Sequence, residues 1–235
     1  MFKNMALAGA IAFSSLFTAT HADALSFPLS GVFNIQAFNY TVVGDNNERR
    51  ANSFATIENF NDIASGSPTI GTVVESAVFT YEGALDFNLS GGDQTIGAFL
   101  ESGSGTAVGV DSSFAGRTLS AGSFSIATLF KITAQSLNID NLSNLVNVFH
   151  DDGISVFGSG DTSVVSAAPT TRKETQLFGQ LTGGVEDFTL IYAAANGNPS
   201  VLEVNAIPLP AALWLLLGAS GGLIIAKRRS ARESS

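Results

Sequence analysis

The sequence contains no cysteine in its 235 residues, and it has little positive charge. Without a thiol the protein forms no disulfide, holds no zinc through thiolates and has no cysteine nucleophile. Its 11 lysine and arginine residues stand against 20 aspartate and glutamate residues, which gives a formal net charge of −9. Nucleic-acid binding needs basic surfaces, so we expect no nucleic-acid partner.

Histidine and tryptophan are nearly as scarce. Outside the N-terminal 24 residues His150 is the only histidine, which excludes a multi-histidine metal centre and leaves one candidate base for a Ser-His-Asp triad. The single tryptophan, Trp214, lies near the C-terminus, so the central region has none to stack on a sugar ring. No nucleophile elbow, phosphate loop or dinucleotide fingerprint occurs in a usable context. We therefore expect no enzyme; paired carboxylates of a glycosidase stay open, because their separation in space decides.

The first 24 residues have the pattern of a secretory signal peptide. Lys3 gives a basic start, residues 5–17 form an apolar core, and Ala22-Asp23-Ala24 is a small-x-small cleavage site. Cleavage after Ala24 would leave residues 25–206 as the exported domain, with the secretion machinery as an expected partner. Cleavage after Ala22 and an uncleaved N-terminal anchor are the alternatives.

The C-terminal residues 207–235 begin with a short apolar span. Residues 211–226 carry no charge, and at about 1.5 Å per residue they make roughly 24 Å of helix. The apolar residues just before them bring the stretch to about the length that crosses a bilayer. The positive-inside rule places the basic cluster that follows in the cytoplasm. We predict a transmembrane helix over 211–226 with the body outside; a buried helix of a soluble domain is the alternative. The basic stop consists of Lys227, Arg228 and Arg229.

A proline motif precedes this span. Its residues are Ile207, Pro208, Leu209, Pro210 and Ala211. Together with the short helix and the basic end, the motif resembles the VPLPA type of the PEP-CTERM sorting signal of bacterial surface proteins, with Ile207 in place of valine. The resemblance covers roughly residues 207–230 and concerns sorting only. It implies cleavage near the motif by an exosortase, an integral-membrane cysteine transpeptidase, and delivery from the inner membrane to the cell surface or extracellular matrix.

The central region has the pattern of an all-β domain. Short segments rich in β-branched and aromatic residues alternate with clusters of glycine, asparagine, aspartate and serine. We predict a β-sandwich or jelly roll with at most one short helix. The expected strands cover residues 32–42, 54–60, 73–81, 85–89, 96–100, 107–110, 124–132, 142–149, 154–157, 176–181, 188–192 and 201–204.

The densest polar group beside expected strands is His150-Asp151-Asp152-Gly153, followed by Asp161. Adjacent carboxylates in a loop are oxygen ligands of the kind that calcium takes, in a site of six to eight oxygens. Asp151, Asp152 and Asp161 are therefore candidate calcium ligands. An ordinary hairpin turn is the simpler interpretation of Asp-Asp-Gly between apolar segments.

Residues 131–204 also resemble the C-terminal half of protective-antigen-type lectin and adhesin domains. The resemblance consists of a strand that leads into Asp151-Asp152-Gly153 and of a later strand that ends at Tyr192. It implies a sandwich, and it implies that the adjacent aspartates bind calcium and glycan, as in some adhesins of that family. The sequence thus leaves two hypotheses. One is an exported, non-enzymatic structural or adhesive protein of the surface or polysaccharide matrix, and the other is a calcium-assisted glycan-binding adhesin.

Overall fold

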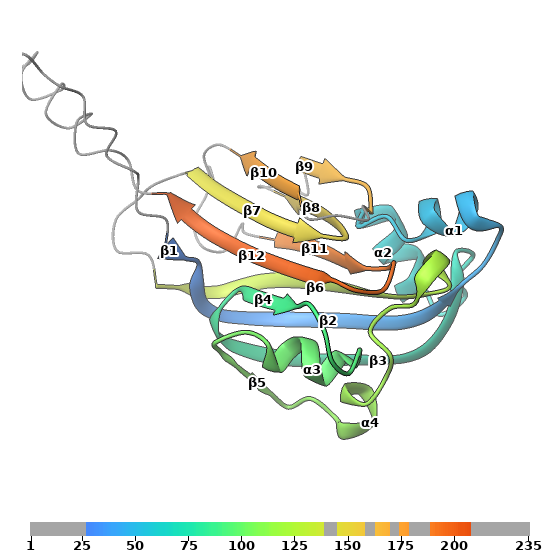
Figure 1. Cartoon of the computed structure of the whole chain (residues 1–235), viewed down its shortest axis with the longest axis horizontal. Coiled ribbons are helices and arrows are strands. Elements are labelled where there is room, and N and C mark those ends of the chain that lie inside the picture. The colour runs from blue at the N-terminus through green and yellow to red at the C-terminus, as the bar shows by residue number, and fades with distance from the viewer. Residues whose placement is uncertain (1–26, 139–144, 158–162, 170–173, 179–188, 208–235) are drawn as a thin grey trace, which may run out of the picture.

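The computed structural model (Figure 1) describes residues 27–138, 145–157, 163–169, 174–178 and 189–207. Within these ranges two antiparallel β-sheets lie one in front of the other, with short helices around them (Figure 1). This arrangement confirms the predicted all-β sandwich. The predicted signal peptide (1–24), transmembrane helix (211–226) and basic stop lie outside the described ranges. No helix in those ranges is long and apolar enough to cross a membrane.

The first sheet has five strands in the described part of the chain. Its order is β1-β12-β7-β10, and β4 pairs with β12 on the same side as β1. The strands are β1 (Phe27–Pro28), β4 (Asp86–Leu89), β7 (Leu145–Asp151), β10 (Glu174–Phe178) and β12 (Ser200–Ile207). The last strand ends at Ile207, so the first residue of the proline motif still belongs to the sandwich.

The second sheet has seven strands in the order β5-β3-β2-β6-β11-β8-β9. The three long strands β3, β2 and β6 lie next to one another in it. The strands are β2 (Ser30–Val42), β3 (Gly71–Ala84), β5 (Thr106–Val108), β6 (Ile126–Leu137), β8 (Gly153–Phe157), β9 (Ser163–Ala167) and β11 (Thr189–Ala194). The sequence patterns did not predict β1 or β9.

One hydrophobic core fills the space between the sheets. Because side chains alternate along a strand, Phe33 and Ile35 of β2 point to the same side and join Val148 of β7 and Val204 of β12 in this core. Burial of these apolar side chains is the main stabilising contribution to the fold.

Four short α-helices and one 3-10 turn lie between the strands in the described residues. They are α1 (Asn46–Asn52), α2 (Ile57–Ala64), α3 (Ile96–Glu101), α4 (Ser112–Ala115) and the 3-10 turn η1 (Gly122–Phe124). The predicted strands over residues 54–60 and 96–100 are therefore wrong, and so is the limit of one short helix.

The two helices that were predicted as strands, α2 and α3, each begin with a threonine N-cap. The hydroxyl of Thr56 accepts the backbone N–H of Asn59 at the start of α2, and that of Thr95 accepts the N–H of Ala98 at the start of α3. A capping hydroxyl satisfies one of the orphan N–H groups of a helix start. Each helix then buries residues three or four apart, as Phe60 and Ile63 show for α2. A segment of only one or two helical turns has too few residues for its helical period to be distinguished from the alternation of a strand.

α2 covers part of the outer face of the seven-stranded sheet. Phe60 packs edge-on against Phe38 of β2, with ring centroids 5.4 Å apart. These two residues, Ile63 and Leu129 of β6 belong to a second, smaller core on this face. The sheet therefore has apolar side chains on both faces at this end.

Candidate functional site

Asp151 and Asp152 lie where the chain passes from one sheet to the other. Asp151 ends β7 in the five-stranded sheet, and Gly153 begins β8 in the seven-stranded sheet. The hairpin interpretation of Asp-Asp-Gly is therefore wrong, because the two flanking strands do not pair. The peptide bond between the two aspartates is cis.

A second passage between the sheets runs beside the first. It is the loop from Ala195 to Pro199, which joins β11 of the seven-stranded sheet to β12 of the five-stranded sheet. The side-chain oxygen Oδ2 of Asp152 accepts the backbone N–H groups of Ala195 (2.5 Å) and Asn196 (3.0 Å). One carboxylate thus ties the two crossovers together.

Three further side chains hold the same corner. The hydroxyl of Tyr192 donates to the backbone carbonyl of Asp151 at 2.5 Å. Nδ1 of His150 lies 2.7 Å from the backbone carbonyl of Asp152, so this ring nitrogen carries the proton and donates. Ser120 accepts the N–H of Gly197 at 3.1 Å. Sequence patterns did not single out Ser120, and Tyr192 was noted only as the end of a strand.

The corner is closed to solvent, which changes its proton affinity. Asp151 and Asp152 are each 1% exposed, and His150 is fully buried. Burial raises the pKa of Asp152 to about 8; the N–H groups of Ala195 and Asn196 act in the opposite direction, and the Asp151 carboxyl adds to the rise. Burial also holds the pKa of Tyr192 well above its usual range, so its hydroxyl stays a donor.

The described residues fit calcium only in part. Calcium takes six to eight oxygens, and Asp151 and Asp152 supply two adjacent carboxyl groups. Oδ2 of Asp152 already accepts two N–H groups, and among the described residues no group of three or more acidic or histidine side chains could hold a metal ion. The third predicted ligand, Asp161, lies outside the described ranges. We therefore assign no metal-dependent chemistry to this corner.

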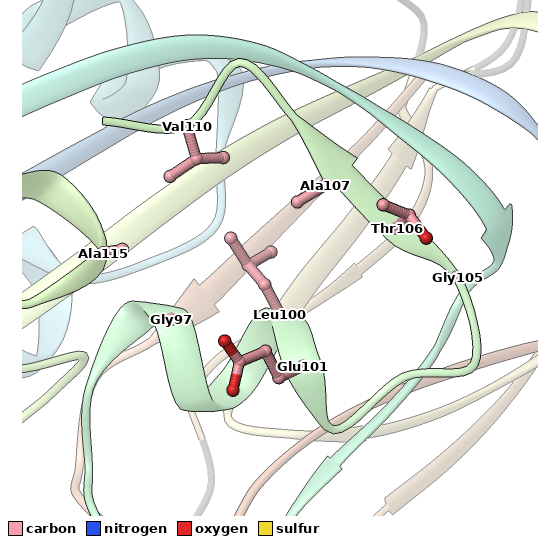
Figure 2. A pocket seen from close by; sticks show the side chains of 8 residues that line it. All are labelled: Gly97, Leu100, Glu101, Gly105, Thr106, Ala107, Val110 and Ala115. Atoms are coloured by element: carbon pink, nitrogen blue, oxygen red, sulfur yellow. The ribbon is translucent and has the colours of Figure 1, made fainter. Parts of the chain in front are cut away.

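A surface pocket lies away from this corner, among α3, β5 and α4 (Figure 2). Its volume is about 340 Å³, and Glu101 is the one ionisable side chain in its lining. Glycoside hydrolysis needs two carboxyl groups across the scissile bond. The lining of this pocket has only one, so the pocket lacks the pair of carboxylates that a glycosidase would need. The lining residues are Gly97, Leu100, Glu101, Gly105, Thr106, Ala107, Val110 and Ala115.

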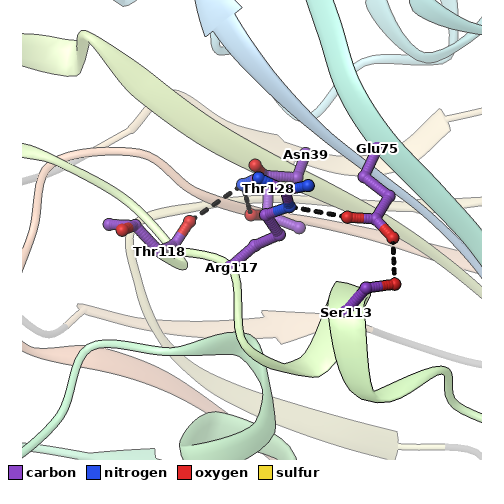
Figure 3. A network of polar contacts seen from close by, with 6 residues as sticks. All are labelled: Asn39, Glu75, Ser113, Arg117, Thr118 and Thr128. Atoms are coloured by element: carbon purple, nitrogen blue, oxygen red, sulfur yellow. Dashed lines mark hydrogen bonds and ion pairs between the residues drawn. The ribbon is translucent and has the colours of Figure 1, made fainter.

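A polar network fastens α4 and the segment after it to the seven-stranded sheet (Figure 3). Glu75 of β3 accepts hydrogen bonds from Ser113 (2.5 Å) and from Nε of Arg117 (2.6 Å). These two donors lower the pKa of Glu75. The buried amide of Asn39 donates to Thr118 and Thr128, both at 2.9 Å. Each of these contacts joins two protein groups, which is the arrangement of a structural tie.

Comparison with known proteins gives two similar solved structures. The chain is similar to the PA14 sugar-binding domain of an RTX adhesin, with 16% identity, 75% of this chain and 87% of that chain covered, and a TM-score of 0.43. It is also similar to the PA14 domain of the antifreeze protein MpAFP, with 14% identity, 77% and 83% covered, and a TM-score of 0.40. PA14 domains are the protective-antigen-type domains that residues 131–204 resemble. No family model and no curated protein matches the sequence. At TM-scores below 0.5 the two structures assign neither ligand nor role to this chain.

Proposed function

We propose that this protein is an exported, non-catalytic component of the cell surface or extracellular matrix, and that its sandwich has a structural or adhesive role. The observation that carries this proposal is the use of the corner residues. Asp152 binds the neighbouring crossover, and His150 and Tyr192 bind backbone carbonyls at the same turn. The polar side chains best suited to catalysis are thus buried, and they join the two sheets.

Export and sorting form the second part of the proposal. They rest on the signal-peptide pattern of residues 1–24 and on the resemblance of residues 207–230 to an exosortase sorting signal. The excess of acidic residues fits a protein that must stay soluble outside the cell.

The mass of the mature protein tests export and sorting. We expect the protein released by its producing cells to lack residues 1–24 and to end near the proline motif, without Trp214. In a variant with both Pro208→Ala and Pro210→Ala we expect the tail to be retained, because the motif is altered while the apolar span and its basic stop stay intact. A mature chain that keeps Trp214 and Arg229 would contradict the sorting proposal, and a protein confined to the cytosol would contradict export.

Calcium-assisted glycan binding is a second candidate function. One observation favours it: the carboxyl group of Asp151 is close enough to that of Asp152 to add to the rise in the pKa of Asp152. A divalent cation between them would relieve this repulsion and displace the proton. A third acidic or histidine ligand would have to come from outside the described residues.

Calorimetry distinguishes the second candidate from the first. If calcium binds, titration of the mature protein gives heat, and the variants Asp151→Asn and Asp152→Asn lose it. Asp93→Asn is the matched control, because it removes one charge from an exposed turn. Absence of heat at millimolar calcium would leave the aspartates with their structural role alone.

A further inference from the structure

The surface pocket among α3, β5 and α4 has an apolar floor that belongs to the main core. Leu100 of α3 is buried in that core, and Ala107 of β5 and Val110 pack against it. Figure 2 shows Leu100 pointing from α3 toward Ala107 and Val110. A ligand in this pocket therefore covers aliphatic carbon atoms, and burial of those atoms favours a ligand with an aliphatic body.

Glu101 supplies the charge of the pocket. It is exposed at the end of α3, and it is the one ionisable side chain in the lining. Gly97 lies four residues earlier on the same face of the helix, and it has no side chain to cover the carboxylate. The pocket thus places one accessible carboxylate beside an apolar floor.

The part of the chain that forms the pocket contains acids and no bases. Residues 51–116 include eight acidic residues and no lysine, arginine or histidine. The next base, Arg117, is held in an ion pair with Glu75, with Nε 2.6 Å from the carboxylate oxygen. The eight acidic residues are Glu58, Asp62, Glu75, Glu82, Asp86, Asp93, Glu101 and Asp111.

Two of these acids stand next to the lining of the pocket. Asp111 directly follows Val110, and Asp86 accepts the N–H of Ser104 at 2.8 Å, one residue before Gly105. No basic side chain of the described residues lines the pocket. Its electrostatic field therefore attracts cations and repels anions.

These properties select the kind of ligand. The volume of about 340 Å³ is at the lower end of the range for ligand pockets, about 300–1,000 Å³, so the ligand is a small molecule. A neutral apolar molecule would cover the Glu101 carboxylate without pairing its charge, which costs free energy. The lining has no aromatic side chain on which a ring could stack. An ammonium group on an aliphatic chain matches both the charge and the floor.

We propose that this pocket binds a small aliphatic amine in its ammonium form. The Glu101 carboxylate holds the ammonium group, and Leu100, Ala107 and Val110 contact the chain. This binding site goes beyond the proposed function, because it depends neither on export nor on the Asp151–Asp152 corner. It needs no metal.

An NMR titration of the mature protein with hexylammonium tests the proposal. We expect the backbone amide signals of Gly97, Glu101 and Thr106 to shift. Methylammonium has the same charge without the chain, and we expect it to bind at least about ten times more weakly. 1-Hexanol has the chain without the charge and should bind about three to five times more weakly. Hexanoate, with the opposite charge, should leave these signals unchanged.

Variants of the lining locate the site. Glu101→Gln keeps the size of the side chain and removes its charge, so hexylammonium should bind about three to five times more weakly. Asp93→Asn is the matched control, because it removes one charge from an exposed turn outside the lining and should bind as the parent does. Ala107→Leu fills the floor and should abolish binding. Thermal melting shows whether each variant is folded, and Glu101→Gln decides alone if Ala107→Leu melts early.

Each other outcome overturns the inference. No shift at tens of millimolar hexylammonium refutes the site. Equal binding of hexylammonium and 1-hexanol shows that the carboxylate does not select an amine. Equal weakening by Asp93→Asn and Glu101→Gln assigns the effect to the overall charge of the protein. Shifts confined to other residues place the amine elsewhere. In all these cases the proposed function stands, because the mass of the mature protein tests it separately.

Discussion

Replacing Phe99 with alanine is expected to lower the free energy of unfolding by about 3–5 kcal/mol. Phe99 is the buried centre of an aromatic group between the sheets. Its ring lies 4.9 Å from that of Phe87, 5.6 Å from Phe130 and 5.5 Å from Tyr192, measured between centroids. The first of these partners belongs to one sheet and the other two to the opposite sheet. Loss of the ring leaves a cavity that both sheets line.

Phe27→Ala is the matched control, because it makes the same chemical change at a residue that is 55% exposed in β1. We expect it to change stability by less than about 0.5 kcal/mol. Urea unfolding followed by circular dichroism measures both variants. A loss below about 1 kcal/mol for Phe99→Ala would show that α3 packs loosely against the sheets and that Phe99 does not join them.

The sequence was sufficient to predict the sandwich but not its helices. Strands such as β6 have a period of two over many residues, and their turns contain glycine, asparagine and aspartate. α3 has six residues, of which Ile96, Phe99 and Leu100 are buried. In so short a segment the same apolar residues fit either structure. The threonine at position 95 was the available signal, and it needed to be weighed as a cap.

The sequence indicated the position of the corner but not the contacts that its side chains make. Asp151 and Asp152 stand out because they are adjacent acids between apolar segments. What they contact follows from topology, since the partners of Asp152 are backbone N–H groups of Ala195 and Asn196, more than 40 residues later. Nearly every residue has a backbone N–H group, so a sequence pattern does not indicate which of them a side chain will contact. Whether two strands beside a turn pair with each other or belong to different sheets depends on the whole fold, which explains the failure of the hairpin interpretation.

The stability of the protein is expected to fall as the pH rises from about 4 to about 8 in calcium-free buffer, because over this range the folded protein keeps a proton on Asp152 that the unfolded chain has released. The pKa of this carboxyl is about 8 in the folded protein, against a usual value of 3.8. Between these values the folded state holds a proton that the unfolded state has released. The contribution is therefore complete below pH 4 and is lost as the pH approaches 8, by up to about 1.4 kcal/mol per pH unit.

Two substitutions at this position separate charge from hydrogen bonding. Asp152→Asn keeps an oxygen that can accept from Ala195 and Asn196 but cannot ionise, so we expect it to lose the pH dependence and to exceed the parent in stability at pH 8. Asp152→Ala leaves two buried N–H groups without their acceptor and should cost about 1–3 kcal/mol at every pH.

The neighbours of Asp152 require a control, because the ionisable side chains of His150 and Asp151 lie beside it in the same turn. Comparison of the parent with Asp152→Asn isolates the contribution of the one carboxyl, and Asp93→Asn at an exposed turn should keep the full pH dependence. Urea unfolding at intervals from pH 4 to pH 8 in EDTA supplies the measurement. If Asp152→Asn retains the slope of the parent, Asp152 is ionised in the folded protein. The carboxylate would then bind the second crossover as a charged acceptor, and the corner would already have the charge that a cation needs.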